Sequence, residues 1–305
     1  LLIKVNRTGK IIWKADVPGE IRGYEQTGQM AIAAGEKNIY VVGTKTNRDR
    51  KGFYHPQEGL WKVKKDDGYC VPWSNGKIVL WLDKPRGSQT IKYQLYASLS
   101  LLWKKIKSSG NNPYPLVDVR GLAVSGNKIY VPFYAENEIS LYNEGGKKIN
   151  EIKGIKKPQG IAVDKEGFIY VASEKRILKI SPAGKTITPI INNLAAPYGL
   201  ALDKEGDIYV SDLGRSQQIK KFSEEGKLLL TIGRPGGDIN FAGPVLPDVL
   251  HFPLGLAVNN YGEICVADSG VPGAWYGGGA RHLVYSGKGK LLDQWFNPGT
   301  TEINI

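Results

Sequence analysis

One phrase recurs along the chain, and this repeat constrains the fold more than any other feature of the 305 residues. The segments PQGIAVDKEGFIYVAS (158–173) and PYGLALDKEGDIYVSD (197–212) are nearly the same in pattern. Three further segments follow it, at 121–131, at 255–266 and, in a degraded copy, at 31–41. A fixed internal repeat indicates a fold that stacks one supersecondary unit several times.

Each repeat predicts two β-hairpins in succession. In the first half, two short apolar runs flank a polar turn such as DKEG (164–167). In the second half, a strand is followed by a tight turn, commonly ending in Gly-Lys, and by another strand. β-branched and aromatic residues fill the runs, while Gly, Asp and Asn occupy turns that need positive φ. Six copies of this second half occur, at 2–13, 60–71, 139–150, 177–188, 219–230 and 282–293.

Two successive hairpins make a four-stranded sheet, which cannot bury both of its faces alone and must stack on its neighbours. The small apolar first run suits a strand crowded near a central axis. We therefore predict an all-β fold, a six-bladed β-propeller of four-stranded antiparallel blades that occupies residues 1–305 as a single domain. Residues 1–17 supply only the outer half of the first blade, so that blade is expected to be incomplete and the sequence to come from a longer protein.

The pattern P-x-G-I-A-V-D-x-x-G-x-I-Y-V followed by I-x-K-F-x-x-x-G-K resembles the NHL repeat family. The resemblance is clear at 158–232 and 253–295, fair at 119–152 and faint before residue 70. It implies a propeller that recognises a partner or assembles a larger protein. From the habit of this family we also expect an exported protein, periplasmic or extracellular.

Long insertions are expected on one face of the propeller. With strands named a to d from the axis outward, the a–b and c–d turns stay short, whereas the insertions fall in b–c or d–a connections. Because function tends to lie on loops carried by a rigid scaffold, this face is predicted to bind. The insertions are 43–59, 74–115, 233–252 and 268–281, and the second of them contains a candidate amphipathic helix within 93–109.

Candidate ligand-binding residues lie at the mouth of the central channel and around it. Arg120, Gln159 and Tyr198 each precede the glycine of the first run in successive repeats, so they should converge on the axis. They suit an anionic or hydroxylated ligand. The insertions contribute further candidates, namely Tyr54, His55, Trp275 and Arg281. Aromatic and arginine side chains in such loops favour a protein, a polyanion or a glycan.

The resemblance also raises an enzyme as the alternative, because NHL-like lyases place histidines at the channel mouth to hold zinc and lactonase-like propellers hold calcium there. The equivalent positions in this chain, at residues 30, 120, 159, 198 and 254, include no histidine. His55, His251 and His282 lie at unrelated offsets, and Asp212 and Asp268 are interpreted as structural acceptors of backbone N–H groups in the following loop. No nucleophile elbow or phosphate loop is present. We predict no catalytic residue, metal or cofactor, with a metal-dependent lyase or lactonase-like enzyme as the alternative.

Charge leaves a third alternative open. The chain carries 41 basic and 29 acidic side chains, a net charge of +12, which suits single-stranded RNA as well as a soluble β-rich surface. Cys70 and Cys265 occupy non-equivalent strand positions and are interpreted as separate thiols. An uninterrupted apolar run of about 18 residues, the length of a membrane-spanning helix, does not occur.

Overall fold

The computed structural model describes residues 2–5, 11–15, 31–48, 54–66, 79–81, 119–134, 136–237, 246, 248–268 and 281–296. The chain forms two compact units. The N-terminal unit comprises Leu1–Met30 and Tyr40–Val117, and the repeat unit comprises Ala31–Ile39 and Asp118–Ile305. No helix in the described ranges has the length and apolar character that crossing a bilayer requires.

The repeat unit contains four antiparallel four-stranded sheets, one for each well-preserved repeat. We call these sheets blades. Their strands, in chain order, are β7 (Ala123–Ser125), β8 (Lys128–Phe133), β9 (Glu138–Asn143) and β10 (Lys148–Lys153); β11 (Pro158–Val163), β12 (Ile169–Ser173), β13 (Arg176–Ile180) and β14 (Ile187–Ile191); β15 (Pro197–Leu202), β16 (Ile208–Asp212), β17 (Gln218–Phe222) and β18 (Leu228–Ile232); β19 (Pro253–Val258), β20 (Ile264–Asp268), β21 (Arg281–Tyr285) and β22 (Leu291–Phe296).

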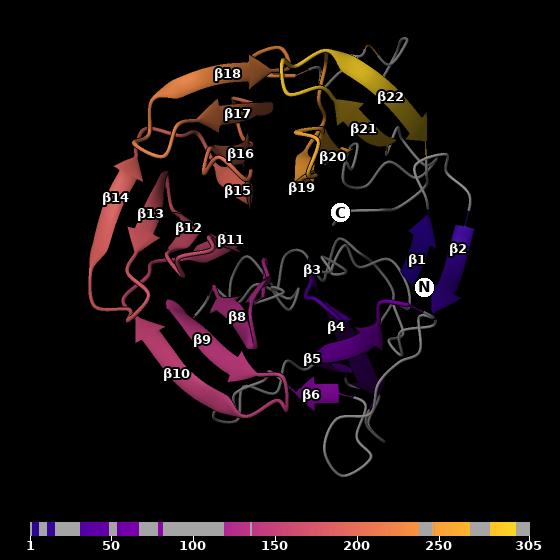
Figure 1. Cartoon of the computed structure of the whole chain (residues 1–305), viewed down its shortest axis with the longest axis vertical. Coiled ribbons are helices and arrows are strands. Elements are labelled where there is room, and N and C mark those ends of the chain that lie inside the picture. Colours follow the sequence, from indigo (N-terminus) through magenta and orange to yellow (C-terminus); the bar gives the residue numbers. More distant parts are fainter. Residues whose placement is uncertain are drawn as a thin grey trace, which may run out of the picture. The chain divides into compact units, whose positions relative to one another are not determined.

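The blades stack face to face, with the first strand of each innermost (Figure 1). β7 packs beside β11, β11 beside β15, and β15 beside β19. An apolar core fills each interface between blades; Ile139 and Ile152, for example, share one cluster with Ile161 and Val171 of the next blade. The two following interfaces contain equivalent clusters. This radial stacking of four-stranded antiparallel sheets is the arrangement of a β-propeller.

Glycines at the start of the inner strands allow adjacent blades to approach closely. A Cβ added at Gly160 would lie 2.1 Å from the carbonyl oxygen of Tyr198. The same contact occurs one blade earlier, where a Cβ at Gly121 would lie 2.5 Å from the carbonyl oxygen of Gln159. Any side chain at these positions would push the inner strands apart, so the third residue of the P-x-G motif has to be glycine.

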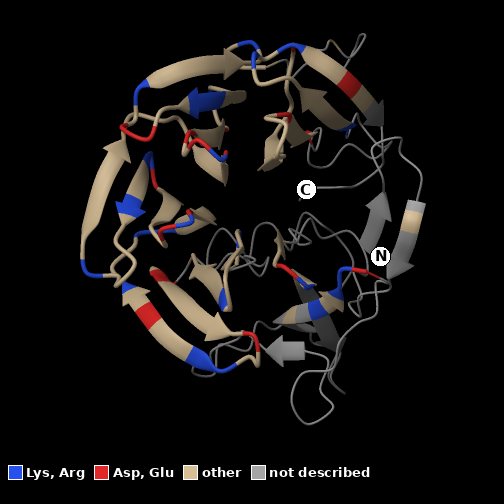
Figure 2. Cartoon of the chain, viewed as in Figure 1, with Lys and Arg blue, Asp and Glu red and all other residues tan. Residues whose placement is uncertain are grey.

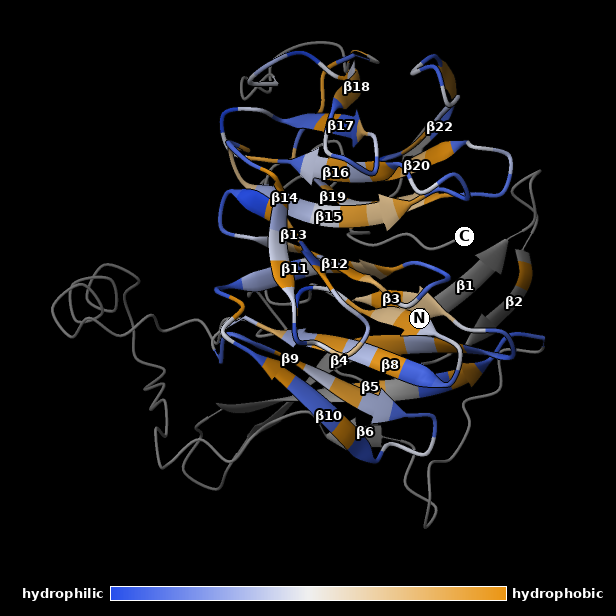
Figure 3. Cartoon of the chain, turned by 60° about the vertical axis from the view of Figure 1, so that its left-hand side comes forward, coloured by the Kyte–Doolittle hydropathy of each residue, from blue (hydrophilic) through white to orange (hydrophobic). Residues whose placement is uncertain are grey.

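Short turns repeat from blade to blade with the same hydrogen bonds. Asp164 accepts a bond from the backbone N–H of Phe168 at 2.8 Å, and Asp203 accepts one from Asp207 at 2.9 Å. The glycine that ends each turn, Gly167 for example, has φ of 88°. Charged residues lie in these turns and on the outer strands, whereas β11, β15 and β19 contain none (Figure 2). The inner strands are accordingly apolar, whereas the turns and outer strands such as β10 are largely hydrophilic (Figure 3).

The described strands form five four-stranded blades, not six. The fifth sheet has the order β3-β4-β5-β6, formed by β3 (Ile32–Ala34), β4 (Asn38–Arg48), β5 (Tyr54–Lys64) and β6 (Val79–Trp81). The predicted first blade is a two-stranded sheet, in which β1 (Leu2–Val5) pairs antiparallel with β2 (Ile11–Ala15). Among the described residues, this hairpin has no further strand paired with it.

The expected insertion at 43–59 is also corrected. β4 extends to Arg48 and β5 begins at Tyr54, so most of this stretch is strand and not loop. Extended pairing satisfies the backbone N–H and C=O groups that a loop would leave to solvent. Apart from β6, the 74–115 insertion, including the candidate helix within 93–109, lies outside the described residues.

Candidate functional site

Arg120, Gln159 and Tyr198 occupy equivalent positions in three consecutive blades. In each blade, the residue just before this position pairs with the last residue of the second strand. These pairs are Val119–Phe133, Pro158–Ser173 and Pro197–Asp212. The same pair in the next blade, Pro253–Asp268, places Leu254 at the fourth equivalent position. The repeat therefore brings the three predicted residues to the same end of neighbouring inner strands.

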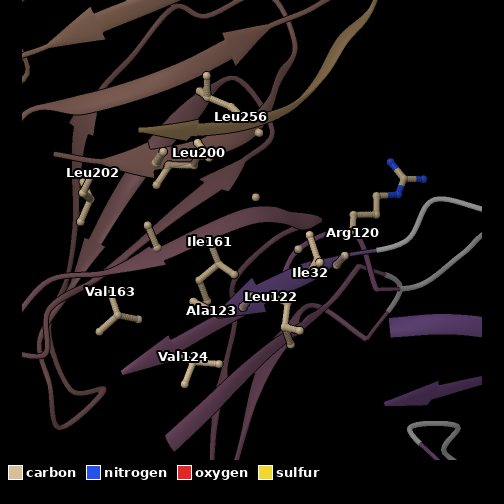
Figure 4. Close-up of a pocket in the computed structure, with 18 of the residues that line it drawn as sticks. Ile32, Arg120, Leu122, Ala123, Val124, Ile161, Val163, Leu200, Leu202 and Leu256 are labelled. Carbon is tan, nitrogen blue, oxygen red and sulfur yellow. The ribbon is translucent and has the colours of Figure 1, made fainter. Parts of the chain in front are cut away.

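These inner strands surround a cavity of about 230 Å³, the central channel. Its lining side chains are mainly small and apolar, from Ala, Val, Leu and Ile of β3, β7, β11, β15 and β19. Among the described lining residues, Arg120 is the one charged residue and Tyr198 is the one tyrosine. Figure 4 shows the Arg120 side chain extending beyond the strand ends, away from the apolar side chains of Ile161 and Val163. Arg120 thus marks one mouth of the channel.

Hydrogen bonds join this mouth across three blades. Nη1 of Arg120 donates to Oε1 of Gln159 at 3.1 Å. The amide of Gln159 in turn donates through Nε2 to the backbone carbonyl oxygen of Pro197 at 3.0 Å. Gln159 therefore fixes the position of the guanidinium while its own position is fixed by the next blade.

Tyr134, which sequence reasoning did not single out, completes the support of Arg120. The guanidinium carbon lies 3.7 Å from the centroid of the Tyr134 ring, a cation–π contact. Nε of Arg120 is buried and makes no hydrogen bond with the described residues. Neither Gln159 nor Tyr134 carries a negative charge, so the positive charge of Arg120 is held in place without being neutralised by them. The only sequence signal for Tyr134 was its place directly after the second strand of the blade that carries Arg120.

Tyr198 is 5% exposed and lines the channel beside Gly199 and Leu200. Burial at an inner strand keeps its ring in one place. The Tyr198 ring therefore forms a fixed part of the channel wall, while Arg120 and Gln159 provide the polar groups at the mouth.

Arg281, predicted as a ligand-binding residue, is buried in the described structure. It begins β21, is fully buried, and its Nε lies 3.1 Å from Oδ2 of Asp268, which is also fully buried. The guanidinium donates further to the carbonyl oxygens of Leu246 and Val249. Burial raises the pKa of Asp268 to about 7, while Arg281 and the N–H of His251 act in the opposite direction. Because the pair ties Leu246, Val249 and His251 to the last blade, its role in this structure is structural.

Asp212 and Asp268 accept backbone N–H groups, as predicted, but from the connection that precedes the inner strand and not from the following loop. Asp212 accepts from Ala196 at 2.8 Å, and Asp268 accepts from His251 at 2.6 Å. Asp212 also binds Nζ of Lys220 at 2.6 Å. Each carboxylate fixes the chain just before a mouth position.

The remaining candidates lie outside the described part of the repeat unit or away from its inner strands. Tyr54 and His55 lie at the start of β5 in the N-terminal unit. Trp275 lies outside the described residues. His282 is buried within β21, and no group of three or more His, Cys, Asp or Glu side chains suited to a metal ion occurs in the described part of the chain.

The sequence matches no known family model and no curated protein. Solved structures, however, resemble the fold across most of the chain, which places it in the β-propeller class. A gluconolactonase from Xanthomonas campestris aligns with a TM-score of 0.54 at 15% identity, covering 92% of this chain and 80% of that one. A chain of the nidogen/laminin complex aligns with a TM-score of 0.53 at 13% identity, covering 88% and 80%. A putative gluconolactonase gives 0.51 at 13% identity, covering 92% and 82%.

Proposed function

We propose that this propeller is a non-catalytic binding module of the NHL type, which holds an anionic group of a partner at the channel mouth through Arg120. The observation that carries the proposal is the arrangement of that side chain, held by Gln159 and Tyr134 with no acidic partner among the described residues. Holding an uncompensated cation in place at a cavity mouth prepares it for an anion before the anion arrives. The partner class is a protein or a polyanionic or glycan ligand.

The test compares Arg120→Ala with Lys165→Ala, which removes the same charge from an exposed turn at the other end of β11. Surface-based binding is measured against three immobilised ligands, an acidic peptide, a sulfated glycan and single-stranded RNA. We expect Arg120→Ala to weaken binding of the peptide or glycan by roughly 10-fold or more, as loss of a charged hydrogen bond does, with Lys165→Ala unchanged. Equal losses in both variants contradict the proposal.

Single-stranded RNA is distinguished by salt. Binding that neutralises several phosphates weakens steeply as salt concentration rises. A steep slope that is the same in wild type and Arg120→Ala favours the RNA alternative over a mouth site.

The lactonase-like alternative requires a divalent metal at the same mouth. Hard-cation sites use several oxygen ligands, mostly carboxylates, and the described channel lining contributes no carboxylate, histidine or cysteine side chain. The resemblance to gluconolactonases is a resemblance of fold. Two results together would support the enzyme alternative. The purified chain would contain stoichiometric calcium or zinc, and it would hydrolyse a lactone in a reaction that a chelator abolishes.

A further inference from the structure

The channel behind Arg120 also restricts what the anionic ligand looks like. We propose that the site takes a small hydroxylated monocarboxylate, with its carboxylate on Arg120 and its hydroxyl groups in the channel. This inference rests on the anion-binding role of Arg120 in the proposed function and assigns a small ligand to the same site, in addition to the macromolecular partners named there.

The carboxylate is favoured by the donors that Arg120 has left. Nη1 is engaged with Gln159, while the buried Nε has no hydrogen-bond partner among the residues that the structure describes, and Nη2 lies on the same edge as Nε. The Nε–Nη2 edge of a guanidinium matches the two oxygens of a planar carboxylate. A carboxylate that binds this edge accepts a hydrogen bond from Nε, which requires the guanidinium to move toward the ligand. The bond removes the free-energy cost of a buried donor without a partner.

Hydroxyl groups are favoured by the backbone of the wall. β7, β11, β15 and β19 each end a sheet and line the channel. The free edge of a strand presents alternating N–H and C=O groups. Small residues such as Ala162 and Ala201 leave that edge accessible. A hydroxyl group donates and accepts, so it matches such an edge, whereas an aliphatic tail would bury the same groups without partners.

Size restricts the ligand further. The cavity of about 230 Å³ has room for roughly eight water-sized groups at ~30 Å³ each. That volume fits a four-carbon chain that carries hydroxyl groups. The wall offers no second described charge, which disfavours a dicarboxylate or a cationic group inside the channel.

A matched four-carbon set separates the two requirements. Threonate carries the carboxylate and the hydroxyl groups, butanoate carries the carboxylate alone, and threitol carries the hydroxyl groups alone. Binding to the full chain is measured by calorimetry and by ligand-observed NMR. We expect threonate to bind at least ~10-fold more tightly than either of the others, because each lacks one set of hydrogen bonds.

Variants then assign the carboxylate to Arg120. Arg120→Ala should reduce threonate binding to the level of threitol, and Arg120→Lys should retain part of it, because lysine keeps the charge and loses the fork. Lys165→Ala should bind as wild type does. Thermal unfolding of each variant, with Arg120→Gln as a second neutral replacement, shows that a loss of binding is not a loss of folding.

Every other outcome overturns the inference. Butanoate binding as tightly as threonate indicates an apolar channel, and threitol binding as tightly indicates that Arg120 does not hold the carboxylate. If none of the three binds while the acidic peptide or glycan still depends on Arg120, the proposed function stands and this ligand class falls. If that dependence is also absent, both fall.

Discussion

Nη1 of Arg120 donates a 3.1 Å hydrogen bond to Oε1 of Gln159, and this bond joins equivalent positions of two neighbouring blades. Sequence spacing alone predicted that both residues would face the same axis. The structure adds that Gln159 is itself fixed by the carbonyl oxygen of Pro197 in the next blade. The mouth is therefore a connected polar arrangement and not three independent side chains.

The contact between blades at Gly160 predicts a large effect of a single methyl group. Gly160→Ala places a Cβ 2.1 Å from the carbonyl oxygen of Tyr198, so the inner strands have to separate. We expect a loss of at least about 2 kcal/mol in the free energy of unfolding, in the range of other overpacked sites. Gly145→Ala is the control, since its Cβ would meet a side-chain oxygen at 3.3 Å and its φ is not positive. Chemical denaturation measures both, and equal stabilities would contradict this account of the inner strands.

The buried pair of Arg281 and Asp268 predicts a contrast with an exposed pair. Arg281→Ala leaves a buried carboxylate and two backbone carbonyl oxygens without their donor, and we expect a cost of roughly 3–5 kcal/mol. Arg234→Ala removes a pair whose side chains are 58% and 55% exposed and should cost less than about 1 kcal/mol. Denaturant titration of both variants tests the contrast. A cost at Arg281 as small as that at Arg234 would show that the buried pair does not hold residues 246–251.

His282 predicts a pH dependence. Burial lowers the pKa of His282 below its ordinary value of 6.5, so the folded state binds fewer protons than the unfolded state. Stability is therefore lost as pH falls below 6.5. His282→Ile, which restores the residue type found at the equivalent Ile177 and Ile219, should remove this loss.

Comparison of the two proteins isolates the histidine. Asp268, whose pKa is raised to about 7, contributes the opposite slope, a loss of stability as pH rises from about 4 to 7. That contribution is present in both proteins and largely cancels in the difference between them. Unfolding free energies at a series of pH values below 6.5 should diverge. Parallel curves would show that His282 does not titrate differently in the folded state.

Cys265 predicts a chemically inert thiol. Burial, with a smaller effect of the Glu263 charge, raises the pKa of Cys265 to about 11, so the thiol stays protonated near pH 8. Since the thiolate is the reactive form, a Cys70→Ser variant should react with a thiol reagent only on unfolding. Labelling in native buffer and in denaturant measures this. Rapid native labelling would place the thiol at an accessible surface.

The sequence predicted the repeated elements best, because each hairpin is specified locally by its apolar runs and its turn. It also predicted the convergence of Arg120, Gln159 and Tyr198, which follows from their identical offsets in the repeat. It did not indicate that Arg281 is buried against Asp268, because an arginine at the start of a strand has the same sequence pattern whether it faces solvent or a buried carboxylate. Tyr134 was missed because it lies directly after the second strand, where no motif in the repeat indicates a contact with Arg120. The count of six was wrong because it included the lone hairpin at the start of the chain as an incomplete blade, whereas the described residues form five four-stranded sheets and this one two-stranded sheet.

The glycine contacts at the inner strands have a consequence for how such a protein diversifies. Each blade meets the next through a glycine on one side and a backbone oxygen on the other, so the joint does not depend on the side chain that precedes the glycine. That preceding position, occupied here by Arg120 and Gln159, is free to change one blade at a time. Substitutions at this position can therefore change which ligand the channel mouth selects while the contacts between neighbouring blades stay the same.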